Sequence, residues 1–306
     1  MKLEKIALLG AGAIGSYFIE CLTEKLGANL WIVAEGERKA RLEEKGLLIN
    51  DKQYQLNVKT PEEAKGADLL IVSVKYGGLT AALPQIKTIV DEHTLVISPL
   101  NGVDSETIIG QVISPARIMP CFMKIASQRV GNTIRFAAKS TPGLFFGEAD
   151  GVKSARVAAL EELFAGTEFH YTVSDDIQRD MWFKYALNIS KNLPQAIINC
   201  GFGGYTDSEH LAYISKRMRD EVVAVAAAKG IDIADENDSR NQNAAKLASA
   251  RFSTLQDLDA KRHTEIDMFS GALVRMGKEL GISTPFNEFA FHAIKCLEEK
   301  NDGLIQ

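Results

Sequence analysis

The chain has 306 residues, of which 46% are hydrophobic and 25% charged, so it resembles ordinary globular proteins and is long enough for two domains. A net charge of −5 argues against nucleic acid or an anionic membrane as partner. The four cysteines are scattered without metal or redox spacing, and no apolar run reaches the length of a membrane span. The first predicted strand begins at residue 5, which leaves no room for a signal peptide. We therefore expect a cytoplasmic protein.

The first twenty residues predict a strand, a glycine turn and a helix. The apolar run 5–9 is followed directly by a G-x-G-x-x-G motif, and apolar residues then recur at helical spacing until Gly27. This is the context in which the motif binds a dinucleotide, because glycines let the backbone approach a pyrophosphate at the helix N-terminus. The alternative is a glycine-rich turn that binds nothing. The residues predicted to contact the cofactor here are Gly10, Gly12, Ala13, Ile14 and Gly15.

A second strand, 30–34, ends at Glu35. An acidic side chain about twenty residues after the glycines can bind both ribose hydroxyls of an adenosine, which favours NAD and repels a 2′-phosphate. Arg38, Lys39 and Arg41 follow at once, however, and any of them could turn toward a phosphate. Segment 35–38 could also be a solvated turn. The choice between NAD and NADP stays open at this point.

The next segments predict more of a parallel sheet. A hairpin is expected over 47–58, a short helix begins at Thr60, buried strands cover 68–74 and 94–98, and a helix covers 77–90. Lys75 and Asn101 directly follow the two buried strands. Ligands of doubly wound sheets bind beyond the carboxyl ends of the strands, so both residues are candidate ligands. A solvated lysine and a simple Asn-Gly turn are the alternatives.

The remaining pattern divides the chain into two domains. Short strands over 118–125, 133–137 and 144–147 predict a meander that extends the sheet, and a helix (154–164) and a strand (168–173) follow. All later segments predict helices: 175–199, interrupted or bent near Pro194, then 208–229, 241–250, 253–280 and 285–300. The predicted fold is α/β: a Rossmann-type doubly wound domain, residues 1–173, followed by an all-helical domain, residues 174–306.

Two groups of polar residues lie in the predicted helical domain. Lys184, Asn188 and Asn192 occur four residues apart and share one face of an otherwise apolar helix. Glu265 lies on another helix, whose first residue, Ser253, is a candidate cap. A solvated helix face would explain the first group equally well, and helix capping alone would explain Ser253. The five histidines are dispersed and no nucleophile elbow occurs, which argues against a metal centre or a hydrolase.

Taken together, these motifs resemble the ketopantoate reductase family from end to end of the chain. The most specific parts are the lysine-asparagine-asparagine helix and the run Thr264-Glu265-Ile266-Asp267. The matching segments are 10–15, Val74-Lys75, Asn101-Gly102, Trp182-Phe183-Lys184 with Asn188 and Asn192, Ser253 with Asp257, 264–267, Gly271 and 281–287.

The resemblance implies reduction of a 2-oxo acid, with ketopantoate as the leading substrate and pantothenate and coenzyme A synthesis as the pathway. It implies Lys184 as the acid that meets the carbonyl oxygen and Glu265 as the group that keeps it protonated. Asn188, Asn192 and Ser253 would bind the substrate, and Asn101 and Lys75 would contact both substrate and cofactor. It further implies NADP(H) as cofactor, although NAD(H) fits Glu35. A homodimer is possible.

Three positions depart from the family pattern. Glu35 stands where NADPH-dependent members usually carry an arginine, Pro120-Cys121 replace a common glycine pair, and Arg135-Phe136 replace a strand histidine. Two alternatives therefore remain. One is an NADH-linked D-2-hydroxy acid dehydrogenase that acts on another 2-oxo acid. The other is a sensor that binds the dinucleotide without turnover.

Overall fold

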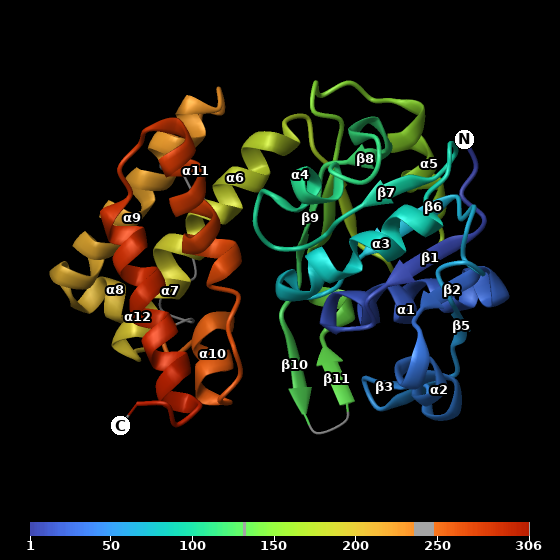
Figure 1. Ribbon diagram of the computed structural model, residues 1–306, viewed down its shortest axis with the longest axis horizontal. Helices are drawn as coiled ribbons and strands as arrows, with labels where there is room; N and C mark the ends of the chain where they lie inside the picture. Colours follow the sequence, from blue (N-terminus) through green and yellow to red (C-terminus); the bar gives the residue numbers. More distant parts are fainter. Residues whose placement is uncertain (131–132, 236–247, 306) are drawn as a thin grey trace. The chain divides into compact units, whose positions relative to one another are not determined.

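The chain divides into two compact units, Met1–Gln178 and Arg179–Gln306. The computed structural model describes residues 1–130, 133–235 and 248–305 (Figure 1). The division falls slightly beyond the boundary at 173/174 that the sequence predicts. Each unit is described by itself.

Unit 1 is built on a six-stranded sheet in the order β5-β2-β1-β6-β7-β8, and every neighbouring pair is parallel (Figure 1). The order reverses between β1 and β6, which confirms the predicted Rossmann-type topology. The strands are β1 Ile6–Leu9, β2 Leu30–Val33, β5 Asn57–Lys59, β6 Leu69–Val72, β7 Leu95–Ile97 and β8 Ile118–Met119.

Alternate residues of the central strands enter two separate hydrophobic cores. In β1, Ile6 and Leu8 join one core while Ala7 and Leu9 join the other, as expected from the period of two along a strand. Helices α1 and α5 contribute to the first core, and α3 and α4 contribute to the second. Both faces of the sheet are therefore covered, which explains why its strands read as continuous apolar runs.

The helices of unit 1 are α1 Ala13–Leu26, α2 Gly36–Lys45, α3 Leu79–Ile89, α4 Ser105–Ile109 and α5 Ala155–Phe164, with 3₁₀ turns at Gly27–Asn29, Tyr76–Gly78, Pro115–Arg117 and Ala138–Ser140.

Two smaller sheets complete unit 1, and they correct the predicted extension of the main sheet. Only β8 extends the main sheet, because Pro120 has no N–H to donate and interrupts the predicted strand 118–125. The following strand pairs elsewhere, in the sheet β13-β12-β9, and the other small sheet has the order β10-β11-β3-β4. These strands are β3 Leu47–Ile49, β4 Lys52–Tyr54, β9 Cys121–Lys124, β10 Ser127–Val130, β11 Thr133–Phe136, β12 Gly143–Phe146 and β13 Tyr171–Val173.

The predicted hairpin is confirmed as β3-β4. Its two turn residues, Asn50 and Asp51, have φ of +46° and +64°, the left-handed values that a tight type I′ hairpin turn requires. The predicted strand ends at Tyr54, however, and β5 is a separate strand of the main sheet. The short helix expected from Thr60 is a turn. Thr60 and Glu63 exchange the side-chain to backbone hydrogen bonds of a helix start, yet no helix follows.

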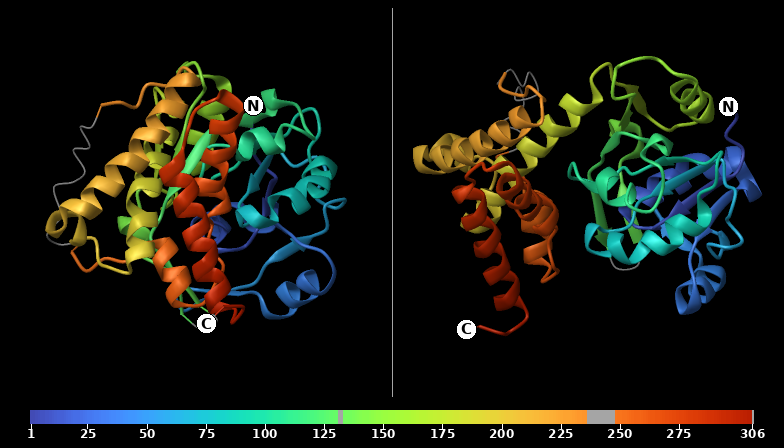
Figure 2. Two further views of the ribbon diagram at one scale, coloured as in Figure 1. Left: turned by 60° about the vertical axis from the view of Figure 1, so that its left-hand side comes forward. Right: turned by 45° about the horizontal axis from the view of Figure 1, so that its top comes forward.

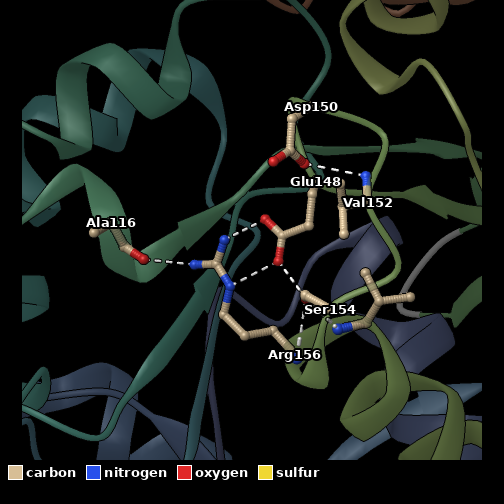
Figure 3. Close-up of polar contacts among 7 residues, drawn as sticks. Ala116, Glu148, Asp150, Val152, Ser154 and Arg156 are labelled. Carbon is tan, nitrogen blue, oxygen red and sulfur yellow. Dashed lines mark hydrogen bonds and ion pairs between the residues drawn. The ribbon is translucent and has the colours of Figure 1, made fainter.

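An ion-pair network fixes the start of α5 (Figure 3). The Ser154 hydroxyl accepts hydrogen bonds from the backbone N–H groups of Arg156 (3.1 Å) and Val157 (3.3 Å) and donates to Glu148. The Arg156 guanidinium binds both carboxylate oxygens of Glu148 and the carbonyl of Ala116. The same guanidinium holds the pKa of Glu148 below its usual value. The network ties α5 to the segments that precede β8 and follow β12.

The Glu106 carboxyl, in α4, lies below the surface, although part of the residue reaches solvent, and burial raises its pKa to about 7. A raised acid pKa makes the folded state bind the proton more tightly than the unfolded state. The contribution of Glu106 to stability should therefore be complete below the ordinary value of 4.5 and be lost as pH rises to about 7, by an amount of the order of 3 kcal/mol. Glu106→Gln should remove this dependence, as measured by urea midpoints across that pH range. Equal slopes for variant and parent would contradict the assignment.

The described residues of unit 2 form helices joined by loops, with no strand among them, as predicted. Helix α6 enters it from the end of unit 1, and the segment predicted as one bent helix is α6, a π-helical turn and α7. Two further predictions are corrected: the helix expected over 253–280 is divided into α10 and α11, and Ser253 is the first residue of α10 rather than its cap. The helix expected over 241–250 lies almost entirely outside the described residues. The helices are α6 Ile177–Leu187, α7 Leu193–Ile198, α8 Gly204–Asp207, α9 Glu209–Ala228, α10 Ser253–Asp259, α11 Ala272–Leu280 and α12 Pro285–Asn301 (Figures 1 and 2), with π turns at Asn188–Asn192 and Asp267–Gly271.

A buried carboxylate joins α9 to the start of α12. Glu221 is 6% exposed and accepts hydrogen bonds from the backbone N–H groups of Phe286 (2.9 Å) and Asn287 (3.0 Å). It also accepts one from the Asn287 side chain at 2.7 Å. Negative charge at a helix N-terminus is favourable, because the first N–H groups have no partner within the helix. Glu221 therefore positions α12 within unit 2.

Some classes of feature are absent from the described parts of the chain. Across residues 1–130, 133–235 and 248–305, no helix is long and apolar enough to cross a membrane. In the same ranges no three His, Cys, Asp or Glu side chains gather in a group that could hold a metal ion. All four cysteines carry free thiols.

Candidate active site

The three glycines of the motif are not required for the same structural reason. Gly10 has φ +108°, and a Cβ there would lie 2.6 Å from the backbone of Ser73. A Cβ on Gly15 would lie 2.1 Å from the Gly10 carbonyl oxygen. These two glycines are required by the close packing of β1, α1 and the end of β6. Gly12 differs, because it is exposed and a Cβ there would meet nothing within 4 Å.

The open space beside Gly12 is the feature of unit 1 that has room for a cofactor. It lies at the N-terminus of the 14-residue helix α1, with Ala13 exposed and Ile14 half-buried. The first N–H groups of this helix have no partners within the helix and carry the positive end of its dipole. The space can thus accept the pyrophosphate of a dinucleotide. The sequence predicted this arrangement, while the role of each residue stays a prediction.

Glu35 lies two residues after the end of β2 and directly precedes the first turn of α2. Its side chain is exposed, and its Oε2 accepts a hydrogen bond from Gln85 Nε2 of α3 at 2.5 Å. The cations that follow are not equivalent. Lys39 donates to the Val58 carbonyl (3.0 Å) and pairs with Glu43 and Glu63, whereas Arg38 and Arg41 are exposed. Lys39 is therefore already engaged within unit 1.

The four candidate cofactor segments of unit 1 lie at one edge of the main sheet. Strands β2, β1, β6 and β7 are adjacent and parallel, so their carboxyl ends, which lead to Glu35, Gly10, Lys75 and Asn101, lie side by side. Lys75 is exposed and Asn101 is half-buried. The loops that carry them are joined by a hydrogen bond of 2.6 Å from Tyr76 to Asp104. The predicted placement is confirmed, and binding by these side chains remains to be tested.

In unit 2, a π turn changes the predicted polar stripe. Lys184 lies in α6, and Asn188 and Asn192 are the first and last residues of the π turn. In an α-helix, four residues overshoot one revolution by about 40°, so a stripe with a spacing of four drifts around the axis. A π turn takes more residues per revolution and counteracts this drift. Lys184 and Asn188 are half-buried and Asn192 is buried.

Glu265 lies just before the second π turn, in the irregular segment between α10 and α11. It is half-buried, and its carbonyl accepts from the N–H groups of Met268 (3.0 Å) and Phe269 (3.1 Å). The two π turns contact each other. Tyr185, next to Lys184, is buried and its hydroxyl lies 2.6 Å from the Phe269 carbonyl oxygen. The segments of Lys184 and Glu265 thus belong to one part of unit 2.

Ser253 is exposed at the start of α10, so its hydroxyl is accessible to a ligand. Gln195 of α7, which is fully buried, holds the segment that leads to it. The Gln195 amide donates to the Ala250 carbonyl at 2.9 Å and accepts from the Phe252 N–H at 2.8 Å. Helices α7 and α10 contact each other. The first residue of α10 is therefore fixed relative to the helix that follows Asn192.

Sequence reasoning missed Gln85 and Gln195. Each fixes a predicted site residue or its segment through hydrogen bonds to a distant part of the chain. For Gln195 a signal exists, since it lies three residues beyond Asn192 and extends the polar stripe of an otherwise apolar helix. Gln85 gives no such signal among the other polar residues of α3.

Comparison with known proteins gives matches along the whole chain. Residues 6–151 match the family model of ketopantoate reductase PanE/ApbA, and residues 176–298 match the model of its C-terminal part. A 2-dehydropantoate 2-reductase of Mesorhizobium japonicum is 28% identical over 305 residues, which cover 92% of this chain and 94% of that protein.

Solved structures share the fold. A PanE/ApbA family ketopantoate reductase from Ralstonia eutropha has a TM-score of 0.80 at 25% identity, with 97% of this chain and 99% of that chain covered. A D-mandelate dehydrogenase in complex with NADH has a TM-score of 0.83 at 23% identity, with 98% and 100% covered.

The two family matches together cover most of the chain, in the order in which the two units occur. The dinucleotide motif lies in the first match, and Lys184 and Glu265 lie in the second. The chain belongs to the ketopantoate reductase family, and it is an NAD(P)-dependent oxidoreductase that acts on CH–OH groups.

Proposed function

We propose that the protein is a 2-dehydropantoate 2-reductase, which reduces ketopantoate to (R)-pantoate for pantothenate synthesis, and that it prefers NADH. The observation that carries the proposal is the arrangement in unit 2, where the segments of Lys184 and Glu265 meet through two contacting π turns. Departures from regular helix of this kind occur frequently at functional sites. Binding of a dinucleotide alone needs neither residue, and membership in an enzyme family sets aside a non-catalytic sensor.

The chemistry requires a proton donor at the carbonyl oxygen. When bound, the reduced nicotinamide supplies the hydride to the ketone carbon, and negative charge develops on the oxygen. Lys184 donates the proton to that oxygen and stabilises the charge before transfer. Glu265 keeps Lys184 in its ammonium form, because a nearby carboxylate favours the protonated state. Both side chains are half-buried, which strengthens their electrostatic effect.

The remaining polar residues bind and orient the substrate. Asn188 and Asn192 offer amide groups to the hydroxyl and carboxylate ends of ketopantoate, and the exposed Ser253 hydroxyl takes part of the carboxylate. Asn101 and Lys75 contact substrate and cofactor at the carboxyl edge of the sheet. These roles follow the family resemblance residue by residue.

The preference for NADH rests on Glu35. Its carboxylate, held by Gln85, can accept hydrogen bonds from both ribose hydroxyls and would repel a 2′-phosphate. Lys39 is engaged by two carboxylates and a carbonyl, so it is a poor phosphate ligand. The exposed Arg38 and Arg41 are the residues that an NADPH preference would have to use.

Replacing Glu35 by Gln should lower kcat/KM for NADH about tenfold and raise that for NADPH. The reason is that the amide loses one charge-assisted hydrogen bond and no longer repels a phosphate. The measurement is steady-state kinetics with both cofactors at saturating 2-oxo acid. The matched control is Glu37→Gln, because Glu37 is also acidic and exposed and lies two residues further on, in the first turn of α2. If the ratio of kcat/KM for NADH to kcat/KM for NADPH did not change, Glu35 would be a solvated side chain with no role in cofactor binding.

The function itself is tested with purified protein, ketopantoate and each reduced cofactor, by the loss of near-ultraviolet nicotinamide absorbance and chiral analysis of the product. We expect NADH to be oxidised in proportion to (R)-pantoate formed. Turnover only with bulkier 2-oxo acids such as phenylglyoxylate would establish the second candidate, an NADH-linked D-2-hydroxy acid dehydrogenase, which Glu35 also favours. No turnover with any 2-oxo acid would refute both.

A homodimer, which the sequence leaves open, is part of this proposal. A ketopantoate reductase from Staphylococcus aureus that shares the fold, with a TM-score of 0.74, is described as dimeric.

A further inference from the structure

The backbone next to Glu265 is tied to the last helix. Glu298 of α12 is 3% exposed, and its Oε1 accepts hydrogen bonds from the Thr264 N–H and from the Thr264 hydroxyl, both at 2.7 Å. The Thr264 hydroxyl in turn accepts from the Ile266 N–H at 3.2 Å. One buried carboxylate thus fixes the residues on both sides of Glu265. Hydrogen bonds to a charged acceptor are the strong ones.

A second contact from the same helix lies two residues beyond Glu265. Lys295 Nζ is 2.7 Å from Asp267 Oδ2 and 3.4 Å from Glu298 Oε2. Burial alone would lower the pKa of Lys295, but the two carboxylates outweigh it and raise the pKa. Lys295 and Glu298 are three residues apart and therefore share one face of α12. We name this pair the α12 clamp.

Further charged groups surround the clamp. His263 Nδ1 lies 3.6 Å from Glu298 Oε2, and His263 Nε2 lies 3.0 Å from Asp302 Oδ2. The His263 side chain is 69% exposed, so its contribution is screened by solvent. The strong contacts of the Glu298 carboxylate are those with Thr264.

The backbone carries the restraint imposed by the α12 clamp to Glu265. The Glu265 carbonyl accepts hydrogen bonds from the N–H groups of Met268 and Phe269, two residues of the π turn. Between the fixed Thr264 and this turn, the Glu265 main chain has little freedom to move. The main chain from which the Glu265 side chain extends is therefore held on both sides by contacts of its neighbours.

We propose that Glu298 is a positioning residue for the reaction, which holds Glu265 where its carboxylate can keep Lys184 protonated. The inference rests on the proposed roles of Lys184 and Glu265 and adds a residue that neither the motif nor its spacing indicates. Glu298 acts only through Thr264 and does not touch substrate or cofactor. A misplacement of about 1 Å at a catalytic group can cost about 100-fold in rate.

The test compares Glu298→Ala with the conservative Glu298→Gln in the full-length protein. The alanine variant should lower kcat about ten- to hundredfold. It should also move the alkaline limb of the pH profile of kcat/KM to lower pH, because Lys184 loses a proton more easily once Glu265 is displaced. Glu298→Gln should restore most of kcat, since an amide oxygen can accept both Thr264 hydrogen bonds. Affinity for the reduced cofactor, measured by fluorescence titration, should be unchanged.

The matched control is Glu299→Ala, because Glu299 is the neighbouring residue of the same helix and is exposed. Wild-type kinetics for Glu298→Ala would overturn the proposal. A variant with lower thermal stability but an unshifted pH profile would also overturn it, since that result describes a structural role alone. Glu265→Gln is measured in parallel. If that variant keeps full turnover, the proposed function of Glu265 fails; if it loses turnover while Glu298→Ala does not, only the positioning role fails.

Discussion

Replacement of Lys184 by alanine is expected to lower kcat by about 10²- to 10⁴-fold, the usual contribution of a positioned acid. Affinity for the cofactor should stay the same, because the residues expected to bind it lie in unit 1. The physical reason is that the carbonyl oxygen gains negative charge during hydride transfer and then has neither a cation nor a proton donor beside it. The loss should therefore appear in kcat and kcat/KM together, as expected for an interaction made mainly in the transition state.

The measurement is steady-state kinetics together with a cofactor titration. The control is Lys216→Ala, which removes a lysine that is 62% exposed and pairs with Asp220 on α9. This variant should behave as wild type. If Lys184→Ala turned over at the wild-type rate, Lys184 would not be the acid. If added small primary amines partly restored the turnover of Lys184→Ala, that result would directly support Lys184 as the acid.

Replacement of Glu221 by alanine is expected to destabilise unit 2 by about 3 kcal/mol. The change leaves the N–H groups of Phe286 and Asn287 and the Asn287 amide without their buried acceptor. It also removes the negative charge at the N-terminus of α12. Desolvated donors without this acceptor account for most of the cost.

Trp182 gives a signal for this experiment because it is buried in α6 of unit 2. Urea unfolding is followed by its fluorescence in a background where Trp31, in β2 of unit 1, is replaced by Phe. Asp220→Asn is the control, because it affects only surface ion pairs, with Lys216 and Arg217, each worth at most about 1 kcal/mol. Equal midpoints for the two variants would show that Glu221 contributes no more than a surface charge.

Much of unit 1 was predictable from local sequence. Buried parallel strands give continuous apolar runs, and the glycine motif lies between the first strand and the first helix. Since the carboxyl ends of parallel strands share one edge, the relative placement of Glu35, Lys75 and Asn101 followed from their positions after strands. The hairpin turn was equally local, because Asn50 and Asp51 tolerate left-handed backbone.

The errors arose where distant contacts decide the structure. Strand β9 looked like a continuation of β8, and only its pairing with β12 shows that it belongs to another sheet. The break between α10 and α11 includes Lys261, whose φ of +52° is unusual for lysine and has no sequence signal. The same holds for the π turns and for the contact of Glu298 with Thr264. Hydrogen bonds between remote segments leave no periodicity that sequence reasoning can detect.

The pairing of β3 with β11 constrains how unit 1 folds. Leu48 pairs with Thr133 and Ile49 with Ile134, so the small sheet joins segments far apart in the chain. Bringing such segments together costs loop-closure entropy before any contact compensates for it. Until β11 has been synthesised and has docked, one side of the β3-β4 hairpin is an apolar strand edge with free N–H and C=O groups. Edges of this kind associate with other chains, which makes this hairpin a point of aggregation during biosynthesis and refolding.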